Sequence, residues 1–124
     1  MPWKAKYNDK HNFVELVYLG KVTPQELHQA LVAAVSLSKE NNTQLFLADC
    51  TEMEGGHSVI DLYSLISLYD NIGLKLGMRE ALLMPSMQSP KADVEFYETA
   101  CLNKGYNVRI FTDLDSAVKW LTRE

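Results

Sequence analysis

The chain has 124 residues, a net charge of −4 and 47% hydrophobic residues. Two domains would have about 60 residues each, too few for comfortable cores, so we expect one domain over residues 1–124. The acidic balance argues against nucleic acid as a partner, because contact with phosphates needs a basic face. No run approaches the roughly 20 apolar residues of a membrane helix, and the first residues form no secretory signal. We therefore expect a cytoplasmic protein with no transmembrane segment.

The cysteines and histidines give no sign of a metal centre or of export. Cys50 and Cys101 are half a chain apart and lack a C-x-x-C pattern. In a reducing compartment they are expected to be reduced and unbridged. The three histidines fall in different segments, without the spacing of a zinc site. We expect no metal and no cofactor.

The start of the chain predicts a β-hairpin followed by a helix. Trp3, Ala5 and Tyr7 alternate with proline and lysine, as in a half-buried edge strand. A polar turn separates them from the largely apolar segment 13–19, which predicts an antiparallel partner strand. The Thr-Pro-Gln-Glu sequence at residues 23–26 then matches a helix start, with a capping box and proline in the first turn.

Two short apolar runs lie further along the chain. Residues 45–48 and 81–84 are unbroken by polar side chains, which is typical of strands buried on both faces of a parallel sheet. We expect them to be adjacent, parallel and central. Residues 49–52 then lie at the carboxyl end of the first run, and residues 53–57 form a loop.

Helices are predicted around these strands. Ser58 begins one that ends at Gly73, and a second covers residues 89–103. A strand at residues 107–111 precedes a last helix capped by Asp113. The order β-β-α-β-α-β-α-β-α favours an α/β fold with a mixed, mostly parallel sheet and an N-terminal antiparallel β-hairpin.

Short segments spread over nearly the whole chain carry a likeness to a known family. They are Tyr18-Leu19-Gly20, residues 22–27, Leu47-Ala48-Asp49, Gly55, Ser58, Asp61-Leu62, and residues 100–105, 108–111 and 117–121. As an ordered set they resemble the STAS (SpoIIAA-like) family of bacterial anti-sigma factor antagonists, and a branch of small uncharacterised bacterial proteins within it. The resemblance implies a SpoIIAA-like sandwich and a non-enzymatic regulatory or protein-interaction module with a protein partner.

The chain departs from that family after its central strand. The family has an Asp-Ser-Ser-Gly-Leu-Gly loop there, with a phosphorylatable serine at a helix start. Residues 49–58 instead read Asp-Cys-Thr-Glu-Met-Glu-Gly-Gly-His-Ser, which is longer and more acidic. Ser58 is equivalent to the family's serine in topology only.

This region is the first candidate site, an interaction or anion-binding loop. Its residues are Asp49, Gly55, Gly56, His57, Ser58 and Asp61. Free amides at a helix N-terminus attract an anion such as phosphate, and the glycines allow close approach. Alternatively, Ser58 and Asp61 only cap the helix, and two nearby glutamates would repel an anion. Asp49 and His57 could also form an acid–base pair, although no G-x-S-x-G motif supplies a nucleophile.

Aromatic residues form the second candidate site, an apolar cavity. They are Tyr18, Tyr63, Tyr69, Phe96 and Tyr97. Such residues more often fill a core, but lipid-binding CRAL-TRIO domains share the fold. A carrier or sensor of a small apolar ligand or lipid is therefore the alternative function. The helix that starts at Ser58 has more apolar residues around it than one sheet face needs, so it could also form a partner surface. A homodimer is a further alternative.

Overall fold

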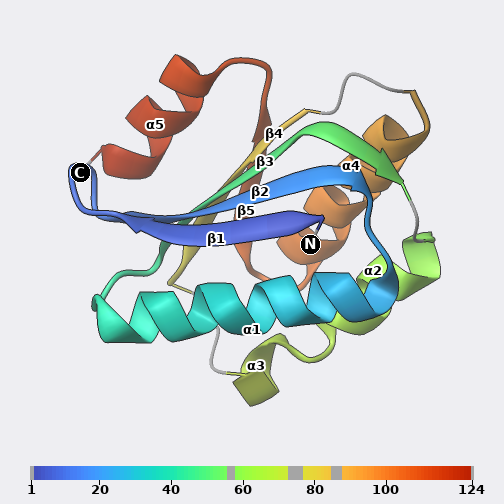
Figure 1. Ribbon diagram of the computed structural model, residues 1–124, viewed down its shortest axis with the longest axis horizontal. Helices are drawn as coiled ribbons and strands as arrows, with labels where there is room; N and C mark the ends of the chain where they lie inside the picture. Colours follow the sequence, from blue (N-terminus) through green and yellow to red (C-terminus); the bar gives the residue numbers. More distant parts are fainter. Residues whose placement is uncertain (1, 56–57, 73–76, 85–87, 124) are drawn as a thin grey trace.

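The structure of the chain, a computed structural model, describes residues 2–55, 58–72, 77–84 and 88–123. Five strands form one sheet in the order β1-β2-β3-β4-β5, and helices cover both faces (Figure 1). The strands are β1 (Trp3–Asn8), β2 (Phe13–Lys21), β3 (Leu45–Gly55), β4 (Arg79–Leu83) and β5 (Asn107–Phe111). The helices are α1 (Pro24–Glu40), α2 (Val59–Ile66), α3 (Tyr69–Ile72), α4 (Gln88–Asn103) and α5 (Leu114–Thr122).

The sheet is mixed, as the sequence predicts. β1 and β2 pair antiparallel, which confirms the hairpin, and the other neighbouring strands pair parallel. β3 lies in the middle of the sheet with β4 beside it. Both apolar runs are buried, with Phe46, Leu47, Ala48, Ala81, Leu82 and Leu83 in the core. The predicted central pair of parallel strands is therefore confirmed.

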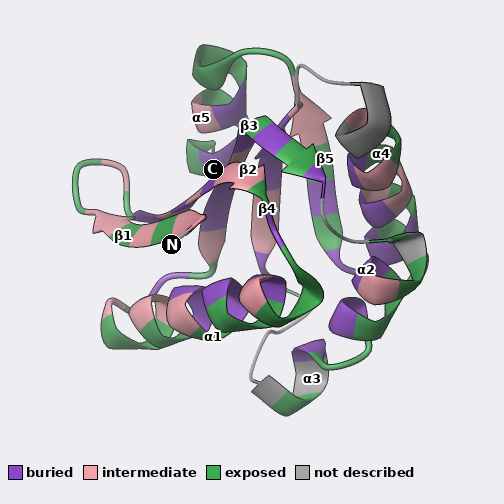
Figure 2. Ribbon diagram, turned by 45° about the vertical axis from the view of Figure 1, so that its right-hand side comes forward, coloured by how far each residue is buried: buried purple, intermediate pink, exposed green. Residues whose placement is uncertain are grey.

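Two cores lie on opposite faces of this sheet. The larger packs α1, α2 and α4 against one face, and the smaller packs α5 against the other. In Figure 2 the inward sides of the helices are buried and the outward sides exposed. Leu82 of β4 belongs to the larger core, whereas Ala81 and Leu83 belong to the smaller one. Because side chains alternate along a strand, Glu80 shares the face of Leu82.

Helix starts follow the capping residues predicted from the sequence. At α1 the Thr23 hydroxyl accepts from the backbone N–H of Glu26, whose carboxylate accepts from the Thr23 N–H at 2.9 Å. At α5 the Asp113 carboxylate accepts from the Ser116 N–H at 2.8 Å. Both bonds satisfy amides that the helix itself leaves free. The predicted starts of α1 and α5 are confirmed.

β3 is longer than the sequence predicts. The prediction ended the strand at Ala48 and placed a loop over residues 53–57, but β3 continues to Gly55. β4 pairs with β3 only up to Asp49, so the rest of β3 pairs with the end of β2 alone, through a shifted register. This outer part alternates exposed side chains with the buried Met53. Because it contains polar residues, this part of the strand does not show the unbroken apolar run by which its first half was predicted.

The helix predicted from residue 58 to residue 73 is two helices, α2 and α3. Ser67 is the C-cap of α2, and both its N–H and its hydroxyl donate to the Tyr63 carbonyl, at 3.2 and 3.1 Å. The chain then turns, and the Tyr69 side chain at the start of α3 enters the core. Gly73, the predicted end of the helix, lies outside the described residues.

Candidate functional site

The start of α2 is the first region that the sequence singles out. The Ser58 N–H donates to Asp61 Oδ2 at 2.8 Å, and the Asp61 N–H donates to Ser58 Oγ at 3.2 Å. These reciprocal bonds form a capping box, in which each side chain satisfies a free amide of the other residue. Ser58 is exposed. Its hydroxyl therefore caps the helix and also faces solvent.

Asp49 and Gly55 both belong to β3, whereas the prediction placed Asp49 at the end of the strand and Gly55 in the loop after it. Asp49 Oδ1 accepts from the Thr51 N–H at 3.0 Å and from the Thr51 hydroxyl at 2.7 Å. Gly55 has a φ of +104°, a conformation that favours glycine. Its carbonyl accepts from the Val22 N–H at 2.8 Å, which ties the end of β3 to the chain leaving β2.

The structure therefore brings together only part of this predicted site. Ser58 and Asp61 are in direct contact. Asp49 is six residues from Gly55 along one strand, which is about 20 Å at the usual rise of a strand. Gly56 and His57 lie outside the described residues, so the acid–base pair of Asp49 and His57 stays a prediction.

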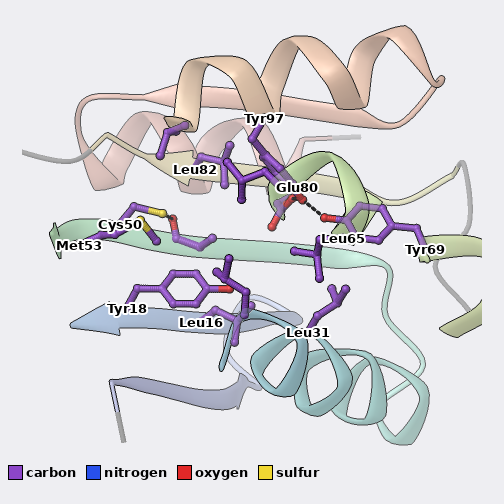
Figure 3. Close-up of a pocket in the computed structure, with 14 residues that line it drawn as sticks. Leu16, Tyr18, Leu31, Cys50, Met53, Leu65, Tyr69, Glu80, Leu82 and Tyr97 are labelled. Carbon is purple, nitrogen blue, oxygen red and sulfur yellow. Dashed lines mark hydrogen bonds between the residues drawn. The ribbon is translucent and has the colours of Figure 1, made fainter. Parts of the chain in front are cut away.

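A cavity of about 50 Å³ lies in the larger core, between the sheet and the helices of that face (Figure 3). Its wall is mostly aliphatic, and its polar groups include the hydroxyls of Tyr18, Tyr69 and Tyr97. Three of the five aromatic residues that the sequence suggests thus line one cavity. Tyr63 and Phe96 instead line a separate hollow between α2 and α4.

Glu80 lines the same cavity and is the residue that sequence reasoning missed. In the sheet it lies between Phe46 of β3 and Val108 of β5, which both belong to the larger core. The Tyr97 hydroxyl donates to Glu80 Oε1 at 2.7 Å, and the Tyr69 hydroxyl is hydrogen bonded to that of Tyr97. β4, α4 and α3 thus meet in one chain of polar groups inside an apolar core.

Burial controls the ionisation of these groups. It raises the pKa of Glu80 from 4.5 to about 7, and the hydrogen bond from Tyr97 offsets part of that rise. Burial, together with the charge of Glu80, also raises the pKa values of Tyr69, Tyr97 and the Cys50 thiol. A carboxyl that titrates near neutrality therefore lies among groups that stay uncharged there.

The sequence does contain a signal that could have identified Glu80 as a residue of the core-facing side of the strand. The predicted strand began at Ala81, but β4 begins at Arg79. Extending the apolar run two residues upstream would have put a glutamate on the face of Leu82 by simple alternation. Because buried glutamates are rare without a partner, that position marks a candidate site.

The described part of the chain has no group of metal-binding side chains and no helix that could cross a membrane. There, no three of the His, Cys, Asp and Glu side chains are grouped as metal ligands would be. No helix among the same residues has the length and apolar character needed to cross a membrane. Both cysteines are buried free thiols.

Two solved structures among those that share this arrangement of strands and helices are informative. One is an uncharacterised protein of the DUF3478 family, with a SpoIIAA-like fold, from Shewanella loihica PV-4. It has a TM-score of 0.61 and 17% identity, over 96% of this chain and 91% of that chain. The other is the anti-sigma factor antagonist SpoIIAA in its unphosphorylated form, with a TM-score of 0.56 and 10% identity, over 92% of this chain and 91% of that chain.

The fold is SpoIIAA-like. This confirms the fold that the resemblance to the STAS family predicts. The sequence itself matches no family model and no curated protein. Within the SpoIIAA-like fold, Ser58 lies at the start of the helix after the central strand, and Glu80 lies on the next strand with its side chain in the cavity wall.

Proposed function

We propose that this chain is a non-enzymatic regulatory or protein-interaction module of the STAS type, and that the exposed side of α2 is its working surface. The SpoIIAA-like fold supports the class, because one protein with this fold is an anti-sigma factor antagonist and so acts on another protein. The proposed surface rests on features of this chain alone.

The exposure of Ile60 carries the proposal. Its side chain is 74% exposed in the first turn of α2, directly after the Ser58 cap, and Tyr63 one turn later is 49% exposed. Full burial of an isoleucine is worth about 1.5–3 kcal/mol. A partner that covered Ile60 would gain that free energy, which the folded chain alone does not use.

The neighbouring hollow extends this surface. It has a volume of about 420 Å³ and lies between α2 and α4, with Tyr63, Phe96 and Lys104 in its wall. The Lys104 ammonium lies 5.2 Å from the centre of the Tyr63 ring, a cation–π contact that links α2 to the end of α4. A partner side chain could enter this hollow while Ile60 packs against the partner's surface.

Ser58 offers a way to regulate such binding. A phosphate on its hydroxyl would meet the free amides and the dipole of the α2 N-terminus, but also the carboxylate of Asp61 in the capping box. The added charge would therefore stand beside Ile60. The proposal therefore includes phosphorylation of Ser58 as the regulatory step.

Site-specific photo-crosslinking in the source cells tests the surface. A photoreactive amino acid replaces Ile60 in one variant and Leu114, which is 52% exposed on α5, in the matched control. We expect one defined protein to crosslink at position 60 and not at position 114. Adding Ser58→Asp should weaken that crosslink, whereas Ser58→Ala should preserve it. Equal crosslinking at both positions, or none, would overturn the proposal.

A lipid carrier is less well supported. The cavity of about 50 Å³ has room for a few heavy atoms, given about 10–15 Å³ for one water. Binding sites for larger organic ligands measure about 300–1,000 Å³. The cavity is therefore too small for an acyl chain in this conformation.

A further inference from the structure

We propose that the cavity at Glu80 binds a short primary alkylammonium ion, with the Glu80 carboxylate as its counterion. This binding site is independent of the partner surface on α2. The proposal rests on the position of one carboxyl in the cavity wall, on the groups that surround it and on the size of the cavity.

The cavity wall contains one charged side chain among its described residues. Figure 3 shows the 14 residues that line it, and Glu80 is the only carboxylic acid among them. Glu80 Oε1 accepts from the Tyr97 hydroxyl, and no hydrogen bond from the described residues reaches Glu80 Oε2. One carboxylate oxygen is thus left for a donor within the cavity.

Among the residues that the structure describes, no Lys, Arg or His lines the cavity to balance that carboxylate. Four elements of the wall contribute titratable groups that stay neutral near pH 7, because burial raises their pKa values: Tyr18 from β2, Cys50 from β3, Tyr69 from α3 and Tyr97 from α4. The described wall residues of α1 and α2 are all leucines. An unpaired charge in such surroundings is costly, so a bound cation would be strongly favoured once Glu80 ionises.

The shape of the site selects a primary ammonium with a short apolar tail. An ammonium group has three donors, which match the free oxygen of Glu80 and the neighbouring tyrosine hydroxyls. The leucines of the wall would contact an alkyl tail. A cavity of about 50 Å³ limits the ligand to a few heavy atoms, at about 10–15 Å³ per water-sized volume.

Propylammonium chloride is the probe, and 1-propanol is its neutral control of equal size. Thermal unfolding is followed at pH 8 in buffers of matched ionic strength. Three proteins are compared: the parent, Glu80→Gln, and the control Glu95→Gln, which removes an exposed carboxylate from α4. We expect propylammonium at ten times its Kd to raise the Tm of the parent and of Glu95→Gln by about 5 °C. Glu80→Gln should show no rise, and 1-propanol should not raise any of the three.

The affinity should also depend on pH. Since binding needs the ionised carboxyl, and the pKa of Glu80 is about 7, the Kd should be about tenfold lower at pH 8 than at pH 6. Three results would each overturn the proposal: no saturable rise in the parent, an equal rise in Glu80→Gln, or an equal rise with 1-propanol. Gln has nearly the shape of Glu, so the Glu80→Gln protein should fold normally. Its own unfolding transition without ligand checks this.

Discussion

Replacing the Glu80 carboxyl with a neutral amide should stabilise the protein at alkaline pH. Burial raises the pKa of Glu80 from 4.5 to about 7 in the folded state. Its contribution to stability is therefore full below about pH 4.5 and is lost as the pH rises through about 7. At about 1.4 kcal/mol per pKa unit, the shift from 4.5 to about 7 predicts a loss of about 3 kcal/mol by pH 8.

Urea unfolding of the parent and of Glu80→Gln from pH 4.5 to pH 8 measures this loss. The amide does not titrate, so its own effect on packing is the same at every pH. Between pH 4.5 and pH 8, the unfolding free energy of Glu80→Gln should therefore rise by about 3 kcal/mol relative to that of the parent. Glu95→Gln, whose carboxyl is exposed, should show no comparable movement. A difference between parent and Glu80→Gln that stays constant with pH would refute the reasoning.

Further predictions concern the polar chain at Glu80, the helix cap and the thiols. Tyr97→Phe removes a bond that stabilises the ionised Glu80, so the pH at which stability falls should move up in the same urea titrations; a downward move contradicts it. Ser58→Ala should lower the unfolding free energy by about 1 kcal/mol through loss of the cap, and an unchanged urea midpoint would exclude that role. Cys50 and Cys101 should react slowly with a thiol reagent in the native protein, because burial raises their pKa values. Both should titrate after unfolding without reductant; no free thiols there would indicate a disulfide.

Much of the fold could be predicted because its signals are local. The capping boxes at Thr23 and Ser58 depend on residues three positions apart. The central strands contain short apolar runs because helices cover both of their faces. The outer half of β3 could not be predicted in this way, since it pairs with β2 alone and its exposed positions are polar.

The candidate site was harder to predict because it depends on contacts between distant segments. Tyr69 and Tyr97 meet across 28 positions, and Tyr97 reaches Glu80 across 17. The sequence suggests Tyr18, Tyr69 and Tyr97 as cavity residues, but Glu80, which lines the same cavity, sits in the two residues by which β4 extends upstream of the predicted strand. Tyr63 has the same residue type and lies on the helix preceding Tyr69, yet it is exposed on the outer side of α2.

The role of α2 as an interaction surface is tested most directly by a binding isotherm with the protein that crosslinks at position 60. Calorimetry would compare the parent with Ile60→Ser and with Leu114→Ser, which removes another exposed apolar side chain, from α5 on the opposite face of the sheet. Loss of about 2 kcal/mol of burial predicts a Kd about 30-fold higher for Ile60→Ser, and an unchanged Kd for Leu114→Ser. Equal affinities for the parent and Ile60→Ser would contradict the proposed role of α2.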